Sequence, residues 1–153
     1  MNCGVKQRRG FKHRRSLAIS PAGLLLLQSF TPMKRVLSIG NCGFDNGSLR
    51  SLVGGFKAEL AAAEDWADAA ELLRRGKFDL VIVNRKLDAD GGDGLEIIRE
   101  MRQSPEFGTL PVMLLSNYPE YQAQAVAAGA EPGFGKLQLH SPGTQELLAQ
   151  YLK

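Results

Sequence analysis

Short runs of consecutive apolar residues alternate along this chain with longer stretches in which apolar residues recur every three or four positions. The clearest apolar run lies within Asp79–Val83, and its composition is typical of a central strand that helices cover on both faces. In Trp66–Arg75 the apolar side chains instead follow the i, i+3, i+4, i+7 spacing of one helix face. Alternation of such segments predicts a parallel sheet with helices on both faces.

Five strand and helix pairs account for the chain after residue 34. We expect strands at Arg35–Ile39, Phe56–Ala62, Asp79–Val83, Pro111–Leu115 and Glu131–Gly135. The helices that follow them are marked by Ser48–Val53, Trp66–Arg75, the apolar positions Leu95, Ile98 and Met101, the segment Tyr118–Ala128, and the apolar positions Leu147, Leu148, Tyr151 and Leu152. The predicted fold class is therefore α/β, a (βα)5 doubly wound parallel five-stranded sheet.

Residues 1–33 differ in composition from the predicted domain at residues 34–153. Six basic residues and no carboxylate precede an apolar stretch within Ser16–Phe30, an order that imitates a secretory or twin-arginine export signal. Pro21 interrupts that stretch, no cleavage site follows it, and it is too short to span a bilayer, so no membrane association is expected. We expect a disordered tail, or residues upstream of a true start at Met33.

Charge and cysteine content exclude several classes of function. From Lys34 onward there are 13 basic and 16 acidic residues, a net charge of −3, which argues against nucleic acid binding by the domain. Cys3 and Cys42 lie in segments of different character, so neither a disulfide nor a metal cage is expected. His13 and His140 have no Cys or carboxylate at ligand spacing. A reducing, cytoplasmic location fits this composition.

Five short motifs lie at strand ends and helix boundaries of the pattern. They are Gly76–Val83, Asp93–Glu96, Leu114–Ser116, Ala128–Ala130 and Lys136. None is specific by itself, but their shared order and spacing resemble the receiver domain of bacterial two-component response regulators. The resemblance covers residues 34–153 and implies a flavodoxin-like fold and a role in phosphorelay-type signal transduction.

Three positions depart from the pattern that this resemblance implies. Receiver domains carry two acidic residues after the first strand, which hold Mg²⁺, and an aspartate at the end of the third strand, which accepts the phosphoryl group. Here these positions are Gly40, Asn41 and Asn84. A carboxamide cannot form an acyl phosphate and remain an amide, and amide oxygens bind Mg²⁺ less well than carboxylates. The resemblance therefore implies a degenerate pseudo-receiver with no metal, no cofactor and no enzymatic activity.

Two other positions match the switch residues of the family. Ser116 corresponds to the hydroxyl residue that bonds the phosphoryl group, and Lys136 to the lysine that pairs with it. Because Asn84 is neutral, we expect Lys136 to lack its anionic partner, with Ser116, Asn84 and Asn41 as hydrogen-bonding neighbours. Ser116 and Lys136 are thus the candidate switch or anion-binding residues.

The residues that correspond to the output face of receiver domains, in the fifth strand and after the lysine, are altered too. The aromatic position of the fifth strand is Gly133, and the proline that usually follows the lysine is Leu137. Phe134 is adjacent to Gly133, but its parity predicts that it points to the opposite face of the sheet.

The loop after Asn84 is two residues longer than is usual in the family. Its acidic, glycine-rich segment Asp88–Gly92 is expected to be flexible. The spacing does not fit a calcium loop, because Gly92 and Arg99 fall where ligands are needed, so a solvated turn is the expectation.

Three hypotheses follow. The first is a phosphorylation-independent interaction module that binds a histidine kinase, another receiver or a second copy of itself through the fourth and fifth strands and their helices. The alternative is an anion or metabolite sensor that uses Lys136, Ser116 and the amides of the first loop. A catalyst ranks last, because Ser116 has no base near it in the sequence.

A restoration experiment distinguishes a pocket that merely lacks carboxylates from one that has been rebuilt. If only the carboxylates are missing, Gly40→Asp and Asn41→Asp together with Asn84→Asp should partly restore Mg²⁺ affinity. Failure with a native fold would mean that the longer loop has rebuilt the site.

Overall fold

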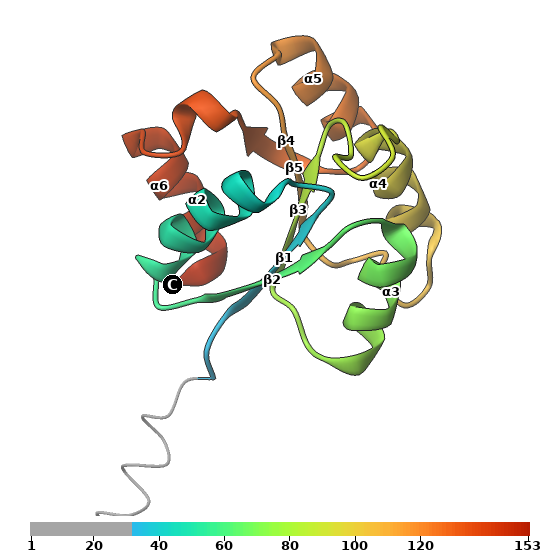
Figure 1. Cartoon of the computed structure of the whole chain (residues 1–153), viewed down its shortest axis with the longest axis horizontal. Helices are drawn as coiled ribbons and strands as arrows, with labels where there is room; N and C mark the ends of the chain where they lie inside the picture. The colour runs from blue at the N-terminus through green and yellow to red at the C-terminus, as the bar shows by residue number, and fades with distance from the viewer. Residues whose placement is uncertain (1–31) are drawn as a thin grey trace, which may run out of the picture. The chain divides into compact units, whose positions relative to one another are not determined.

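Five parallel strands form one sheet in the order β2-β1-β3-β4-β5 (Figure 1). This computed structural model describes residues 32–153, and the expectations for the leader fall on residues outside that range, apart from its last two positions. The strands are β1 (Arg35–Ile39), β2 (Glu59–Ala63), β3 (Leu80–Asn84), β4 (Val112–Leu115) and β5 (Glu131–Phe134). Every pair of neighbouring strands is parallel, as the sequence predicts.

Helices cover both faces of this sheet. They are α2 (Gly43–Gly54), α3 (Trp66–Arg75), α4 (Gly94–Gln103), α5 (Pro119–Ala127) and α6 (Pro142–Leu152), with a short 3-10 turn, η1, at Lys136–Gln138. Residues of α2 and α6 pack together on one face, and residues of α3, α4 and α5 pack on the other. The predicted doubly wound (βα)5 fold is confirmed.

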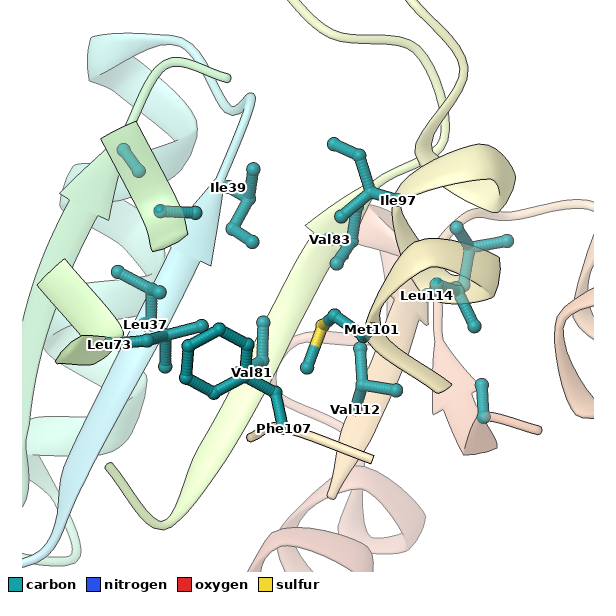
Figure 2. Packing of buried hydrophobic residues seen from close by; sticks show 14 of the residues in the cluster. Leu37, Ile39, Leu73, Val81, Val83, Ile97, Met101, Phe107, Val112 and Leu114 are labelled. Atoms are coloured by element: carbon teal, nitrogen blue, oxygen red, sulfur yellow. The ribbon is translucent and has the colours of Figure 1, made fainter. Parts of the chain in front are cut away.

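The middle strand β3 organises the core, because all five of its residues are buried. Val81 and Val83 point to the face covered by α3 and α4, where they meet Met101 and Phe107 (Figure 2). Leu80 and Ile82 point to the other face and pack with residues of α2 and α6. This alternation explains why both parities of the strand are apolar.

Polar residues fix the helix starts that border the sheet's carboxyl edge. Asp93 caps α4 by accepting a hydrogen bond from the Leu95 amide, and Cys42 caps α2 through its sulfur, which accepts from the Asp45 amide. Gly94 allows a close approach, since a Cβ there would lie 2.0 Å from the Asn84 carbonyl oxygen. Both helices therefore begin directly beside the ends of β1 and β3.

The largest boundary error concerns the second strand, which begins at Glu59 and not at Phe56. Phe56 and Lys57 instead form a turn after α2, in which the amides of Phe56 and Ala58 both donate to the Val53 carbonyl. Lys57 has a φ of 58°, a left-handed conformation that a strand does not contain. The other predicted boundaries differ by a residue or two, apart from helix starts that the sequence left undefined.

No helix in residues 32–153 combines the length and the apolar composition needed to cross a membrane.

Arg102 at the end of α4 joins two loops through its guanidinium group, the loop between α4 and β4 and the loop between α5 and β5. It donates to the carbonyl oxygens of Gly129 at 2.7 Å, Gly108 at 3.2 Å and Leu110 at 2.8 Å. We expect Arg102→Ala to lower the free energy of unfolding by about 2 kcal/mol, because three acceptors lose a charged donor. The matched control Arg99→Ala removes a surface ion pair with Glu96 on the same helix and should change it by less than about 0.5 kcal/mol. Urea titration measures both, and equal effects would contradict the assignment.

Candidate functional site at the carboxyl edge of the sheet

The fold brings the predicted site residues to one edge of the sheet. Gly40 and Asn41 follow β1, Asn84 ends β3, Ser116 follows β4, and Lys136 follows β5. The carboxyl ends of parallel strands meet at the same edge, which is where ligands of open α/β sheets bind. Asn84, Ser116 and Lys136 line one cavity of about 390 Å³.

The side chain of Asn84 is a hydrogen-bond donor to two backbone carbonyls. Its amide nitrogen lies 3.1 Å from the carbonyl oxygen of Gly40 and 2.7 Å from that of Lys86. The residue is buried, with 8% of its surface exposed. A carboxylate has no hydrogen to donate and would face both oxygens with a negative charge. The geometry therefore requires an amide at this position.

The position of Gly40 is filled by a neighbouring apolar side chain. Gly40 has a φ of +74°, and a Cβ built on it would lie 2.5 Å from Cγ of Leu87. Leu87 belongs to the loop after β3 and is 5% exposed. The carbonyl of Gly40 also accepts from the Asp88 amide at 2.9 Å, so this loop is fastened to the end of β1. No side chain fits here without movement of Leu87.

Asn41 belongs to a buried polar network. Its amide nitrogen donates to the Ser38 hydroxyl at 2.9 Å, and that hydroxyl donates to the side-chain oxygen of Asn46 at 2.6 Å. Asn46 in turn donates to the Asn41 carbonyl at 2.9 Å. Among the described residues the side-chain oxygen of Asn41 has no partner. The network fixes the turn from β1 into α2 with neutral groups only.

The longer loop after β3 contains several backbone hydrogen bonds. Lys86 and Asp93 form an antiparallel bridge, the Leu87 amide donates to the Gly92 carbonyl at 2.9 Å, and the Gly91 amide donates to the Leu87 carbonyl at 2.8 Å. Asp88 lies at the exposed surface, as a solvated turn requires. Within residues 32–153 no three His, Cys, Asp or Glu side chains gather in a geometry that could hold a metal ion.

Lys136 has an anionic partner, so the expectation that it lacks one is wrong. Its ammonium nitrogen lies 2.5 Å from a carboxylate oxygen of Asp45. Asp45 is in the first turn of α2, where the helix dipole favours negative charge, and 18% of its side chain is exposed. Within the described residues Lys136 donates no hydrogen bond to Ser116, Asn84 or Asn41, and its ammonium group is paired with Asp45 of α2 instead.

Ser116 is buried, and its side chain stabilises the turn between β4 and α5. Its hydroxyl oxygen accepts a hydrogen bond from the Tyr118 amide at 3.3 Å. Ser116 and Lys136 border the same cavity, so the structure brings the two candidate anion-binding residues together.

Gln122 of α5 occupies the side of β5 on which Gly133 lies. Its amide nitrogen donates to the carbonyls of Leu114 and Ser116, each at 3.0 Å, and its oxygen accepts from the Gly133 amide at 3.1 Å. A Cβ on Gly133 would lie 2.2 Å from the Leu114 carbonyl oxygen. Phe134 is buried in the opposite layer with α2 and α6, as its parity predicts.

Sequence reasoning missed the residues that rebuild this edge. These residues, Asp45, Leu87 and Gln122, lie outside the motifs. Their partners are Lys136, Gly40 and Gly133, none of which is close to them in the sequence. For Asp45 one signal was present, since it is the first carboxylate after β1 and precedes the predicted helical segment Ser48–Val53. No pattern in the sequence indicated that Leu87 packs over Gly40.

Comparison with known proteins bears on the fold and on the family. The family model described as the response regulator receiver domain matches residues 47–137. A response regulator from Thermotoga maritima is similar in structure, with a TM-score of 0.64, 24% identity and coverage of 78% of this chain and 98% of that one. A putative response regulator from Chloroflexus aurantiacus has a TM-score of 0.67 and 20% identity, with coverage of 78% of this chain and 97% of that one. The chemotaxis protein CheY4 of Vibrio cholerae has a TM-score of 0.62 and 19% identity, with coverage of 79% of this chain and 99% of that one.

At these identities the solved structures show the fold alone, whereas the family model matches more than half of the chain. The protein therefore belongs to the response regulator receiver domain family of two-component signalling.

Proposed function

We propose that this protein is a receiver domain that signals without phosphorylation, as a non-enzymatic module that binds another protein. The observation that carries the proposal is the donation of two hydrogen bonds by the Asn84 amide to the carbonyls of Gly40 and Lys86. By the resemblance described above, Asn84 stands where the family has its phosphoacceptor aspartate. An aspartate at this position would lose both hydrogen bonds.

The residues at the edge do not fit Mg²⁺. This ion prefers carboxylate oxygens in octahedral geometry, and the positions matching the family's acidic pair are Gly40 and Asn41. Leu87 packs against Gly40, so an apolar side chain takes the space beside the end of β1. The carboxylate of Asp45 is already paired with Lys136. We therefore derive no step that depends on this ion.

Two contacts connect the helices to the last two strands. Gln122 joins α5 to both β4 and β5 through neutral hydrogen bonds, and an ion pair between Lys136 and Asp45 joins the end of β5 to α2. A surface fixed by such contacts supports recognition by shape and not by a change of state.

Two exposed apolar side chains border the Lys136 contact. Phe44, 83% exposed, precedes Asp45 in α2, and Leu137, 89% exposed, follows Lys136. The contact between Asp45 and Lys136 therefore brings the two segments that carry them together. Exposed apolar groups beside charged ones are typical of protein contact surfaces. The partner in this proposal is a histidine kinase, another receiver or a second copy, in the cytoplasm.

An anion sensor is the second candidate. It is favoured by one observation, that Ser116 and Lys136 line a cavity whose bordering residues include no carboxylate.

Treatment with acetyl phosphate tests the proposal directly. We expect intact-mass spectrometry to show no phosphoryl addition to the protein, with or without Mg²⁺, because Asn84 is no nucleophile for this donor. A receiver domain with an intact aspartate, treated in parallel, supplies the positive control. Labelling of Asn84, or Mg²⁺-dependent labelling of any residue at the carboxyl edge, would refute the proposal. Fresh protein is needed, since deamidation of Asn84 would create an aspartate.

Replacement of Asn84 tests whether the two hydrogen bonds of its amide stabilise the fold. Asn84→Asp should lower the free energy of unfolding by about 1–3 kcal/mol at neutral pH, because two buried acceptors lose their donor. The deficit should shrink as the pH falls and the new carboxyl group gains a proton to donate. Asn117→Asp is the control, since the Asn117 side chain accepts a hydrogen bond from the Leu137 amide through its oxygen, a role that a carboxylate keeps. Equal losses in both variants would count against the argument.

The structure reverses the expectation for the three-aspartate variant. Gly40→Asp with Asn41→Asp and Asn84→Asp should not restore Mg²⁺ affinity, because Leu87 and the left-handed backbone at Gly40 exclude the first carboxylate. Isothermal titration with MgCl₂ measures this, with circular dichroism to confirm the fold. Millimolar or tighter binding by the folded variant would show that the loop yields.

The contact surface is tested by a pair of polar substitutions. Phe44→Ser with Leu137→Ser should abolish capture of the partner that the wild-type protein retains, and should leave the free energy of unfolding nearly unchanged, because both side chains are exposed. Met33→Ser, at an exposed apolar position before β1 and away from the fourth and fifth strands and their helices, is the matched control and should retain the partner. The capture should be the same with and without acetyl phosphate. Retention of the partner by the double variant would place the contact elsewhere.

A further inference from the structure

The cavity at the carboxyl edge is large enough for a small organic molecule. Its volume is about 390 Å³, and it lies where the loops after β3 and β4 meet the start of α5 and the residue after β5. Ligand pockets in proteins range from about 300 to 1,000 Å³. Four of its bordering side chains, Arg85, Lys86, Tyr118 and Tyr121, have no role in the contacts that replace the acidic pocket.

The charge of this cavity favours an anion. Three cationic side chains border it, Arg85, Lys86 and Lys136, and no carboxylate does. Arg85 is paired with Asp93 at 3.2 Å and Lys136 with Asp45, and both acids lie outside the lining. Lys86 forms no ion pair within residues 32–153. The cavity therefore keeps an excess of positive charge.

The walls of the cavity favour a flat ligand. The guanidinium group of Arg85 lies over the ring of Tyr121, 4.1 Å from its centroid, and the rings of Tyr118 and Tyr121 meet edge to face at 5.9 Å. Leu115 adds an apolar contact. A planar ring gains contact with such surfaces, whereas a tetrahedral phosphate does not. The aromatic walls thus distinguish one class of anion from another.

Hydrogen-bond donors remain available for a carboxylate. Within the described residues Arg85 uses one terminal nitrogen of its guanidinium, Nη1, for Asp93, and the other, Nη2, forms no hydrogen bond, whereas the unpaired Nε is buried and out of reach of a ligand. The Ser116 hydroxyl accepts from the Tyr118 amide and donates to no group of the described chain. Arginine pairs readily with carboxylates through two parallel hydrogen bonds.

We propose that this cavity binds a small aromatic carboxylic acid, with the carboxylate toward Arg85 and Lys86 and the ring against Tyr118 and Tyr121. The inference goes beyond the interaction module, since such a ligand supplies an input at the edge that phosphorylation serves in other receivers. It does not rest on that module, because binding is measured on the purified chain without a partner.

The experiment uses four probes on the full-length protein. Isothermal titration compares benzoate with its neutral counterpart benzamide, its saturated counterpart cyclohexanecarboxylate, and inorganic phosphate. We expect benzoate to bind saturably and at least about tenfold more tightly than each of the others, a difference of about 1.4 kcal/mol. If benzamide binds as tightly as benzoate, the proposed recognition of the negative charge is wrong. If phosphate binds as tightly as benzoate, the proposed preference for a planar anion is wrong. Absence of saturable benzoate binding overturns the proposal.

Substitutions assign the binding to this cavity. Lys86→Gln should weaken benzoate binding severalfold, while Lys77→Gln, at an exposed lysine bordering a separate cavity at the amino edge, should leave it unchanged. Tyr121→Leu should remove the preference for benzoate over cyclohexanecarboxylate. If Tyr121→Leu does not fold, the two lysine variants still decide the location, because equal weakening by both would refute it.

Discussion

One side chain, the amide of Asn84, joins the end of β1 to the loop after β3 at the carboxyl edge of the sheet. It donates to the carbonyl at the end of β1 and to a carbonyl of its own loop, and so joins two strand ends and a turn. The loop held in this way places Leu87 against Gly40. A neutral donor performs this task at low cost, since a buried carboxylate facing two carbonyl oxygens would require a counter-ion.

The charge that remains at this edge is balanced over a long sequence distance. Lys136 pairs with Asp45, 91 residues earlier in the chain, so the contact closes the gap between the segment after β5 and the first turn of α2. Gln122 performs a similar role between α5 and the last two strands. Together the two contacts join the ends of β4 and β5 to the helices α2 and α5.

The sheet could be predicted from the sequence because burial on both faces leaves a direct trace, an unbroken apolar run such as that in β3. The inference from Asn84 that the edge lacks a phosphoacceptor stays a prediction. The contacts that replace the carboxylates could not be predicted, because they depend on the direction of single side chains in three dimensions. Leu87 reads as an ordinary apolar residue, and the pairing of Lys136 with Asp45 requires the fold to be known first. The predicted start of β2 was wrong for a local reason, because the chain makes a turn with a left-handed residue at Lys57.

Loss of an acidic pocket and replacement of one are physically different, and the structure supports replacement. Simple loss would leave open space at Gly40, an unpaired Lys136 and a gap beside Gly133. Instead, Leu87 packs against Gly40, and the Asp45 carboxylate pairs with Lys136. The Gln122 side chain accepts a hydrogen bond from the Gly133 amide. Each of these contacts satisfies a group whose isolation would destabilise the fold. Because the three contacts lie on separate elements, reversal of one does not restore the others.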